Sequence, residues 1–239
     1  MKLICYLSMG YPSIEHSIKI AKEYVKAGCD IIEIDFPTRN CYLEGEYIKN
    51  RMHGALDACD DYQEYMRAIV RIKNDNPTAK FIVLAYENTI LEIGVQEFLD
   101  FCIQNELYDL IYIGSEYPEV RSMLIANGIR VSSYVQFHLP EEEVENAKVT
   151  NGFIYLQAKP GKEINPKFPN LKTSIDYFRK TLNLKNPIYC GVGISSPEDI
   201  RRVKEAGADG ALVGSLVLKL HNDIPKMSAT IRALKAAAE

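Results

Sequence analysis

The chain has 239 residues and a formal net charge of −4, and 47% of its residues are hydrophobic. This composition is that of a folded globular protein, and the slight acidity argues against nucleic acid or an anionic membrane as the main partner. No apolar run approaches the roughly 20 residues that a membrane-spanning helix needs. The N-terminal "MKLICYLSMG" has too short an apolar core for a signal peptide, so we expect a cytoplasmic protein.

In the first half of the chain, short apolar strands alternate with amphipathic helices. Strands are expected at 3–8, 31–36, 81–86 and 110–113, and helices at 13–28, 62–73 and 95–105. The second half continues the alternation. Strands are expected at 130–135, 153–158, 187–190 and 210–214, and helices near 117–127, from 140, at 172–181, at 196–207 and at the C-terminus.

These elements form eight strand–helix units with short connections and no shift in composition. Regular alternation of this kind predicts a parallel sheet, and eight units predict its closure into a single-domain (β/α)8 TIM barrel over residues 1–239. A doubly wound open sheet is the structural alternative. Because the first strand starts almost at residue 1, no N-terminal helix is expected to cover the bottom of the barrel.

The second strand, "IIEIDF" at 31–36, carries two acids inside an apolar run. Since strand side chains alternate between faces, Ile31, Glu33 and Asp35 share one face, and the other face is wholly apolar. The apolar face should pack against helices, so both acids should point into the barrel near the strand's C-terminal end, where barrel enzymes place catalytic groups. Burial would raise the pKa of such an acid toward the neutral range. An inward salt bridge to a basic residue on a neighbouring strand is the alternative.

The stretch "GVGISSPEDIRRVKEAGADGALVGS" at 191–215 has the pattern of a phosphate site. Gly191 and Gly193 follow the seventh strand and allow a ligand to approach the backbone closely. The eighth strand ends at Gly214 and Ser215, and the short helix that follows would direct free N–H groups at an anion. Glycine-rich loops after these two strands form the usual phosphate site of this fold. Two tight turns without a ligand are the alternative.

The cysteines and histidines do not form the pattern of a metal site or of a disulfide framework. The six cysteines include no close CxxC pair, and the four histidines share no spacing. Cys5, Cys102 and Cys190 lie in apolar runs and are expected to be reduced core residues. Cys41 lies in a polar loop, where either loop filler or a chemical role is open. No pattern calls for a metal, a nucleotide or a flavin, so no cofactor is expected.

Several of these stretches occur together in one family. "SMGYPS" at 8–13, "AGCDIIEIDFP" at 27–37, Tyr86 with Asn88, and the 191–215 stretch resemble the tryptophan synthase alpha chain family along nearly the full length. The family's N-terminal helix is not expected in this sequence. The resemblance implies a lyase that cleaves indole-3-glycerol phosphate to indole and glyceraldehyde 3-phosphate by a retro-aldol reaction.

The resemblance also implies roles for individual residues. Glu33 matches the family's acid/base glutamate, and Glu44 falls where the family has an aspartate that engages the indole N–H. The remaining matches line the pocket or bind phosphate, namely Tyr6, Leu84, Tyr86, Tyr155, Gly193, Gly214 and Ser215. A phosphorylated small-molecule substrate and a tryptophan synthase beta-like partner are implied in the same way.

The sequence departs from the family pattern at three places. Glu44 is one methylene longer than the family's aspartate, and Asp35 replaces a glycine beside Glu33. The loop after the sixth strand is "AKPGKEI" at 158–164, where the family has Arg-Ser-Gly-Val-Thr-Gly. The loop after the second strand reads Arg39-Asn40-Cys41 and then Leu43-Glu44-Gly45, where the family has Ser-Asp-Pro and then Ala-Asp-Gly. This loop and the loop after the sixth strand engage the beta chain in the family.

Three functions are therefore open from the sequence. The first is the lyase reaction, with Glu33 as acid/base and Glu44 on the indole side. The second is an aldol cleavage or enolisation of another sugar phosphate, with Glu33 and Asp35 as the working acids. The third is a non-catalytic subunit.

Overall fold

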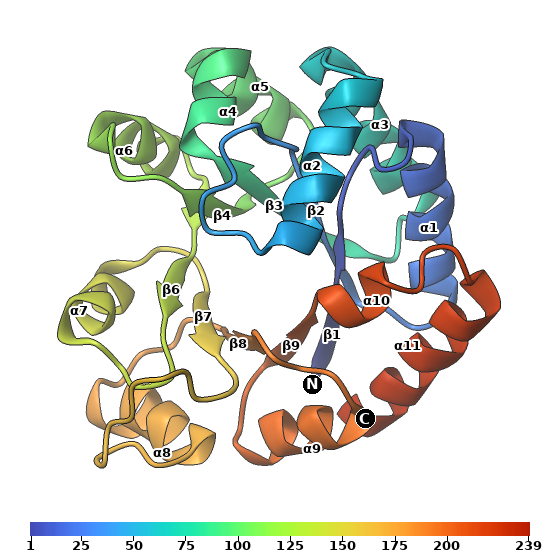
Figure 1. The fold of residues 1–239 in the computed structure, drawn as a ribbon. Coiled ribbons are helices and arrows are strands. Elements are labelled where there is room, and N and C mark those ends of the chain that lie inside the picture. The colour runs from blue at the N-terminus through green and yellow to red at the C-terminus, as the bar shows by residue number, and fades with distance from the viewer.

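The computed structural model describes residues 1–239, whose strands form one parallel sheet that curves into a barrel (Figure 1). The strands are β1 (Lys2–Leu7), β2 (Ile31–Asp35), β3 (Lys80–Tyr86), β4 (Asp109–Ile113), β5 (Arg130–Val131), β6 (Ser133–Val135), β7 (Ile154–Gln157), β8 (Ile188–Gly191) and β9 (Gly210–Val213). β1 pairs with both β2 and β9, so the last strand of the chain lies beside the first.

The single strand expected at 130–135 is divided at Ser132. Its first piece, β5, pairs with β4, and its second piece, β6, pairs with β7. The two edges of the sheet are therefore consecutive pieces of one strand, and the ring is interrupted only between them. The strand order follows the chain, which confirms the predicted (β/α)8 barrel and excludes the doubly wound sheet.

Helices surround the strands (Figure 1). The expected ones are α1 (Ile14–Lys26), α3 (Tyr62–Asp75), α5 (Val95–Gln104), α6 (Pro118–Ala126), α7 (Glu141–Val149), α9 (Pro197–Glu205), α10 (Ser215–Leu218) and α11 (Ile224–Ala238). The helix expected at 172–181 is α8 (Leu171–Asp176), which continues as one π-helical stretch (Tyr177–Thr181). Two helices were not expected, α2 (Glu46–Ala58) and α4 (Glu87–Ile93).

α2 escapes sequence analysis for a physical reason. Its inner face buries Arg51 together with Met52, Ala55 and Leu56, and it contains Gly54. A charged residue on the buried face breaks the apolar periodicity that marks an amphipathic helix. Its N-cap is Gly45, which offers no capping side chain.

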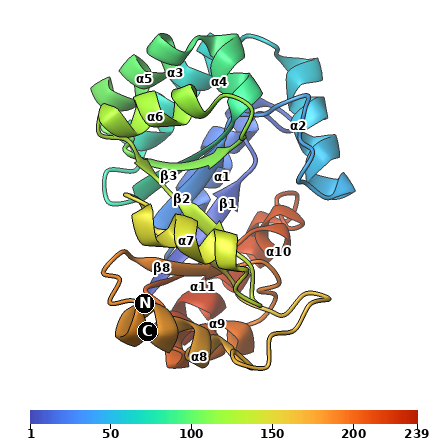
Figure 2. The same ribbon diagram turned by 90° about the vertical axis from the view of Figure 1, so that its left-hand side faces the viewer.

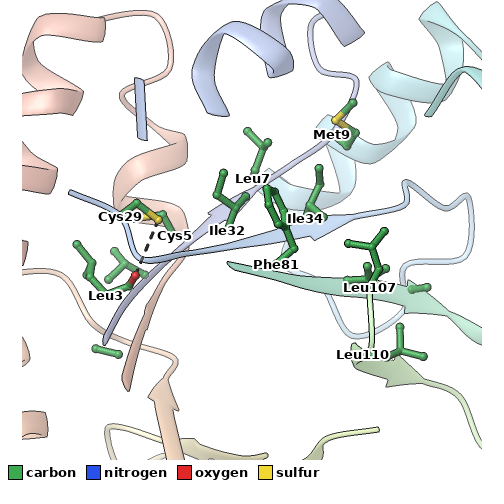
Figure 3. Packing of buried hydrophobic residues seen from close by; sticks show 14 of the residues in the cluster. Leu3, Cys5, Leu7, Met9, Cys29, Ile32, Ile34, Phe81, Leu107 and Leu110 are labelled. Atoms are coloured by element: carbon green, nitrogen blue, oxygen red, sulfur yellow. Dashed lines mark hydrogen bonds between the residues drawn. The ribbon is translucent and has the colours of Figure 1, made fainter. Parts of the chain in front are cut away.

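The core has two parts, one on each face of the sheet. Ile32, Ile34 and Phe36 belong to the cluster between strands and helices, and Figure 3 shows the first two packed beside residues of β1 and β3. Ile31 belongs to a smaller cluster inside the barrel. The alternation predicted for the second strand is thus confirmed, and the acids that share the Ile31 face point inward.

The two ends of the barrel are used differently. The chain termini lie at the end where the strands begin, with the Met1 amino group 3.2 Å from the Ala238 carbonyl oxygen. α2, α10 and the segment between β7 and α8 lie together at the right-hand end in Figure 2, where the strands finish. We call this end the mouth. No helix of the chain combines the length and the apolarity that crossing a membrane requires.

Candidate active site

A cavity of about 740 Å³ opens at the mouth of the barrel. Of its 21 lining residues, 13 are hydrophobic, so it can accept a largely apolar molecule. Eight residues expected at the site line it, namely Tyr6, Glu33, Glu44, Leu84, Tyr155, Gly193, Gly214 and Ser215. Three others, Asp35, Tyr86 and Gly191, do not.

Glu33 is the most perturbed acid of the cavity wall. It lies in the middle of β2, opposite Tyr6 of β1 in the sheet register, and only 5% of it is exposed. Burial first, and then the negative charges of Glu44 and Asp35, raise the pKa of Glu33 to about 8. No lysine or arginine pairs with it, so the expected alternative of an inward salt bridge is absent. At neutral pH its carboxyl group carries a proton that it can deliver into the cavity.

Glu44 reaches the cavity from the segment between β2 and α2, one residue before the Gly45 cap. The Tyr86 hydroxyl donates a hydrogen bond of 3.2 Å to Glu44 Oε1. Burial raises the pKa of Glu44, and the Tyr86 hydrogen bond opposes that rise in part. Tyr86 was expected to line the pocket, but it is fully buried and instead supports Glu44. Figure 1 shows this segment and α2 in front of the ends of β2, β3 and β4.

Asp35 is fully buried and does not line the cavity. Its Oδ2 accepts a 2.5 Å hydrogen bond from the Tyr6 hydroxyl, and its Oδ1 accepts one of 2.5 Å from the Met9 amide. Burial raises the pKa of Asp35 to about 7, against the opposing effect of these hydrogen bonds and of the Arg51 charge. Asp35 therefore contacts the cavity residue Tyr6 without lining the cavity itself, and its place among the working acids stays a prediction.

A buried arginine on α2 begins a chain of hydrogen bonds that reaches β1. Arg51 Nη2 donates to His221 Nδ1 over 3.0 Å, and His221 Nε2 lies 2.7 Å from the Tyr24 hydroxyl. Because arginine can only donate, Nδ1 accepts and Nε2 carries the imidazole proton. Tyr24 then donates to the Tyr6 carbonyl over 3.0 Å. Burial and the Arg51 charge lower the pKa of His221 to about 3, so the ring is neutral.

The predicted phosphate glycines divide into two groups. Gly193 and Gly214 line the cavity, and their N–H groups donate no hydrogen bond within the chain. Ser215 follows at the first position of α10 and is exposed. Gly191 has another reason to be glycine, because a β-carbon there would lie 2.7 Å from the Tyr155 hydroxyl oxygen and 2.9 Å from Leu212 Cβ. It makes room for the Tyr155 ring, and its place in the phosphate site stays a prediction.

Other lining residues were not foreseen from the sequence. Tyr112 of β4 and Tyr134 of β6 contribute to the cavity lining, and the Tyr134 ring stands edge-on to Tyr155 with centroids 5.5 Å apart. Tyr42 and Leu43 lie in the segment before α2 and are more than half exposed at the mouth. The alternation rule applied to β6 could have found Tyr134, but on β4 it places Tyr112 with Leu110 on the face toward the helices. No comparable signal exists for residues of an irregular segment.

All six cysteines are free thiols. Cys5, Cys102 and Cys190 are buried, as expected. Cys41 is also buried, with 3% of it exposed, and its sulfur lies 3.5 Å from His53 Nε2. Burial raises the pKa of the Cys41 thiol, which is the opposite of what an activated nucleophile needs. No group of three or more His, Cys, Asp or Glu side chains converges to hold a metal ion.

Comparison with known proteins identifies the family. The sequence model of the family described as tryptophan synthase alpha chain matches residues 1–239. The chain belongs to this family. Among relatives, the tryptophan synthase alpha chain of Buchnera aphidicola is 27% identical over 92% of this chain and 84% of its own length. That of Methanosarcina barkeri is 26% identical over 97% of this chain and 88% of its own.

Solved structures agree in fold. An Aquifex aeolicus structure has a TM-score of 0.86 at 22% identity and covers 99% of this chain and 92% of its own. The tryptophan synthase subunit alpha of Campylobacter jejuni has a TM-score of 0.81 at 24% identity, covering 98% and 95%. Members of the tryptophan synthase alpha chain family are carbon–carbon lyases of tryptophan biosynthesis that cleave indole-3-glycerol phosphate, and this chain is a lyase of that kind. The whole-length match favours this function over the two alternatives.

Proposed function

We propose that Glu33 is both acid and base in the retro-aldol cleavage of indole-3-glycerol phosphate. The observation that carries the proposal is one cavity that holds both a buried carboxyl group with a raised pKa and two unpaired glycine N–H groups. Glu33 first delivers its proton to C3 of the indole ring. The resulting carboxylate then removes the proton of the adjacent glycerol hydroxyl. The carbon–carbon bond breaks, its electron pair restores the indole ring, and the hydroxyl carbon becomes the aldehyde.

Glu44 supports the ring in this scheme. Protonation of C3 leaves a positive charge on the ring nitrogen, and a carboxylate at the N–H stabilises that charge more in the transition state than in the substrate. The Tyr86 hydrogen bond fixes one Glu44 oxygen and leaves the other for the ring N–H. The tyrosines and aliphatic residues of the cavity bury the ring itself, among them Leu84 and Tyr155.

The phosphate group belongs at the turn after β8 and at the start of α10. The N–H groups of Gly193 and Gly214 and the Ser215 hydroxyl are available there. Backbone donors hold an anion without lysine or arginine, so the chain's net charge of −4 does not oppose this assignment. Binding the phosphate at these groups orients the reacting carbon toward the Glu33 carboxyl group.

Asp35 acts through Tyr6 as a positioning residue. We expect Tyr6→Phe and Asp35→Asn each to lower kcat/KM by about tenfold or more, because either change frees the Tyr6 ring beside Glu33. The double variant should be no worse than the poorer single variant, since both remove one interaction. Steady-state kinetics of the four proteins measure this coupling. Independent, multiplying losses would contradict it.

A tryptophan synthase beta-like partner fits the mouth. Tyr42, Leu43, Tyr47 and Tyr117 are exposed around the cavity, and exposed aromatic side chains mark interaction surfaces. Neighbours in fold come from tryptophan synthase of Mycobacterium tuberculosis and from a tryptophan synthase complex of Pyrococcus furiosus.

Six free thiols are consistent with a reducing compartment such as the cytoplasm.

Incubation of the purified chain with indole-3-glycerol phosphate tests the function directly. We expect indole and glyceraldehyde 3-phosphate in equal amounts, measured by absorbance and by coupled dehydrogenase assay. The dephosphorylated substrate is the matched control and should react far more slowly. Absence of indole together with tight binding of another sugar phosphate would transfer support to the second function. Absence of any binding would support a non-catalytic subunit.

A further inference from the structure

The turn that carries Gly193 is held in an unfavourable backbone conformation. Val192 has a φ of 63° and Gly193 a φ of 90°, so two successive residues adopt the left-handed region. Glycine does so freely, but a β-branched residue such as valine does so only at a cost in free energy. Both residues line the main cavity. Contacts from outside the turn must therefore keep it in place.

One such contact comes from Lys159, in the segment after β7. Its aliphatic stem covers Gly193, because a β-carbon on Gly193 would lie 3.0 Å from Lys159 Cδ and 3.4 Å from Cβ and Cγ. Its Nζ lies 2.9 Å from each carboxylate oxygen of Asp199 on α9. The neighbouring Ala158 amide donates a 2.6 Å hydrogen bond to the Gly191 carbonyl. The segment after β7 thus contacts the turn through Lys159 and Ala158.

Asp199 of α9 binds both Lys159 and Ser195, the residue that lies two positions after Gly193. It is buried, with 6% exposed, and its Oδ2 accepts hydrogen bonds from the Ser195 amide over 2.9 Å and the Ser195 hydroxyl over 3.1 Å. Burial alone would raise the pKa of Asp199, but the hydrogen bonds from Lys159 and Ser195 outweigh it and lower the pKa. Asp199 is therefore a carboxylate at neutral pH, and it connects Lys159 to the residue two positions after Gly193.

We propose that Lys159 and Asp199 are positioning residues that hold the Val192–Gly193 turn so that the Gly193 N–H faces the substrate phosphate. The proposal rests on the proposed function, because it assigns to that function's phosphate site the pair that shapes it. Neither residue needs to touch the substrate. The pair acts on the phosphate-bearing end, whereas Glu33 and Glu44 act on the indole end.

The test measures binding of glycerol 3-phosphate by titration calorimetry, apart from catalysis. Lys159→Met keeps the stem and removes the charge, and Asp199→Asn keeps the shape and removes the charge. Each should weaken glycerol 3-phosphate by about tenfold or more, the worth of one charge-assisted hydrogen bond. KM for the full substrate should rise by a similar factor while kcat changes by less than about twofold. Lys159→Arg should restore most of the affinity.

Matched controls lie close by. Lys162→Met changes an exposed lysine of the same segment, and Glu198→Gln changes an exposed acid beside Asp199 that pairs with Arg201. Both should bind glycerol 3-phosphate like the wild-type chain. Unchanged affinity in folded Lys159→Met and Asp199→Asn proteins would overturn the proposal, as would a wild-type chain that does not bind glycerol 3-phosphate. Failure of the proposed lyase function is distinct, since it would show as binding without release of indole.

Discussion

Glu33→Gln is expected to lower indole release by about a thousandfold, which is the usual scale for loss of a general acid–base group. Glutamine keeps the shape of the side chain, but it can neither deliver a proton to the indole ring nor accept one from the glycerol hydroxyl. Single-turnover measurement of indole formation at saturating substrate isolates the chemical step from binding. A variant that keeps more than about a tenth of the wild-type rate would remove Glu33 from the acid–base role.

Unfolding measurements separate this effect from a damaged fold. The pKa of Glu33 is raised by folding to about 8, so the unfolded chain loses this proton at lower pH than the folded chain. The buried group therefore costs stability progressively as pH rises from about 4.5 to about 8. Glutamine does not ionise, so Glu33→Gln should melt at a higher temperature than the wild-type chain at pH 8. The two proteins should converge near pH 4.5.

The fold was predictable because each face of each strand has a single environment. Ile32, Ile34 and Phe36 meet helices, and Ile31 meets the barrel interior, so alternation along six residues sufficed to orient Glu33. The interruption at Ser132 was not predictable, because the residues on both sides of it are ordinary strand formers. α2 was missed because Arg51 occupies its buried face, where only tertiary contacts supply its partners.

The site was predictable where one element supplies the function and unpredictable where several converge. The inward orientation of Glu33, for example, follows from β2 alone. Tyr86 was misplaced because its hydroxyl is engaged by Glu44, 42 residues away, and no local pattern carries that information. The contact between Lys159 and Asp199 could not be predicted for the same reason, because the two residues are 40 positions apart in the sequence.

Three acids, Glu33, Asp35 and Glu44, lie in or beside the cavity and have raised pKa values. Burial raises the pKa of all three. The Glu44 charge further raises the pKa of Glu33 and of Asp35, and the Asp35 charge further raises that of Glu33. Arg51 opposes this for Asp35 only, from a position between α2 and His221. Burial, together with the two neighbouring negative charges and without a counter-charge, keeps the proton on Glu33 at neutral pH. Removing either neighbouring charge should therefore lower the pKa of Glu33, and with it the fraction of Glu33 that is protonated at neutral pH.

Glu44→Gln tests that coupling and has the second-largest expected effect. The loss of the carboxylate at the ring N–H should lower kcat by about a hundredfold. The loss of its negative charge should also lower the pKa of Glu33. Because the protonated form of Glu33 starts the reaction, kcat/KM of the wild-type chain should fall as pH rises through about 8. In Glu44→Gln this decline should begin at lower pH.

Two further variants separate the effect of the Glu44 charge from that of its side-chain length and position. Glu44→Asp keeps the charge on a shorter side chain, so its decline should stay near the wild-type pH although its rate falls. Glu46→Gln removes an acid two residues away whose side chain is 84% exposed, and it should change neither quantity. The measurement is kcat/KM for indole release from pH 6 to about pH 9.5, the range that brackets the raised pKa. A Glu44→Gln decline at the wild-type pH would show that the Glu44 charge does not set the acidity of Glu33, and the raised pKa would then rest on burial and Asp35.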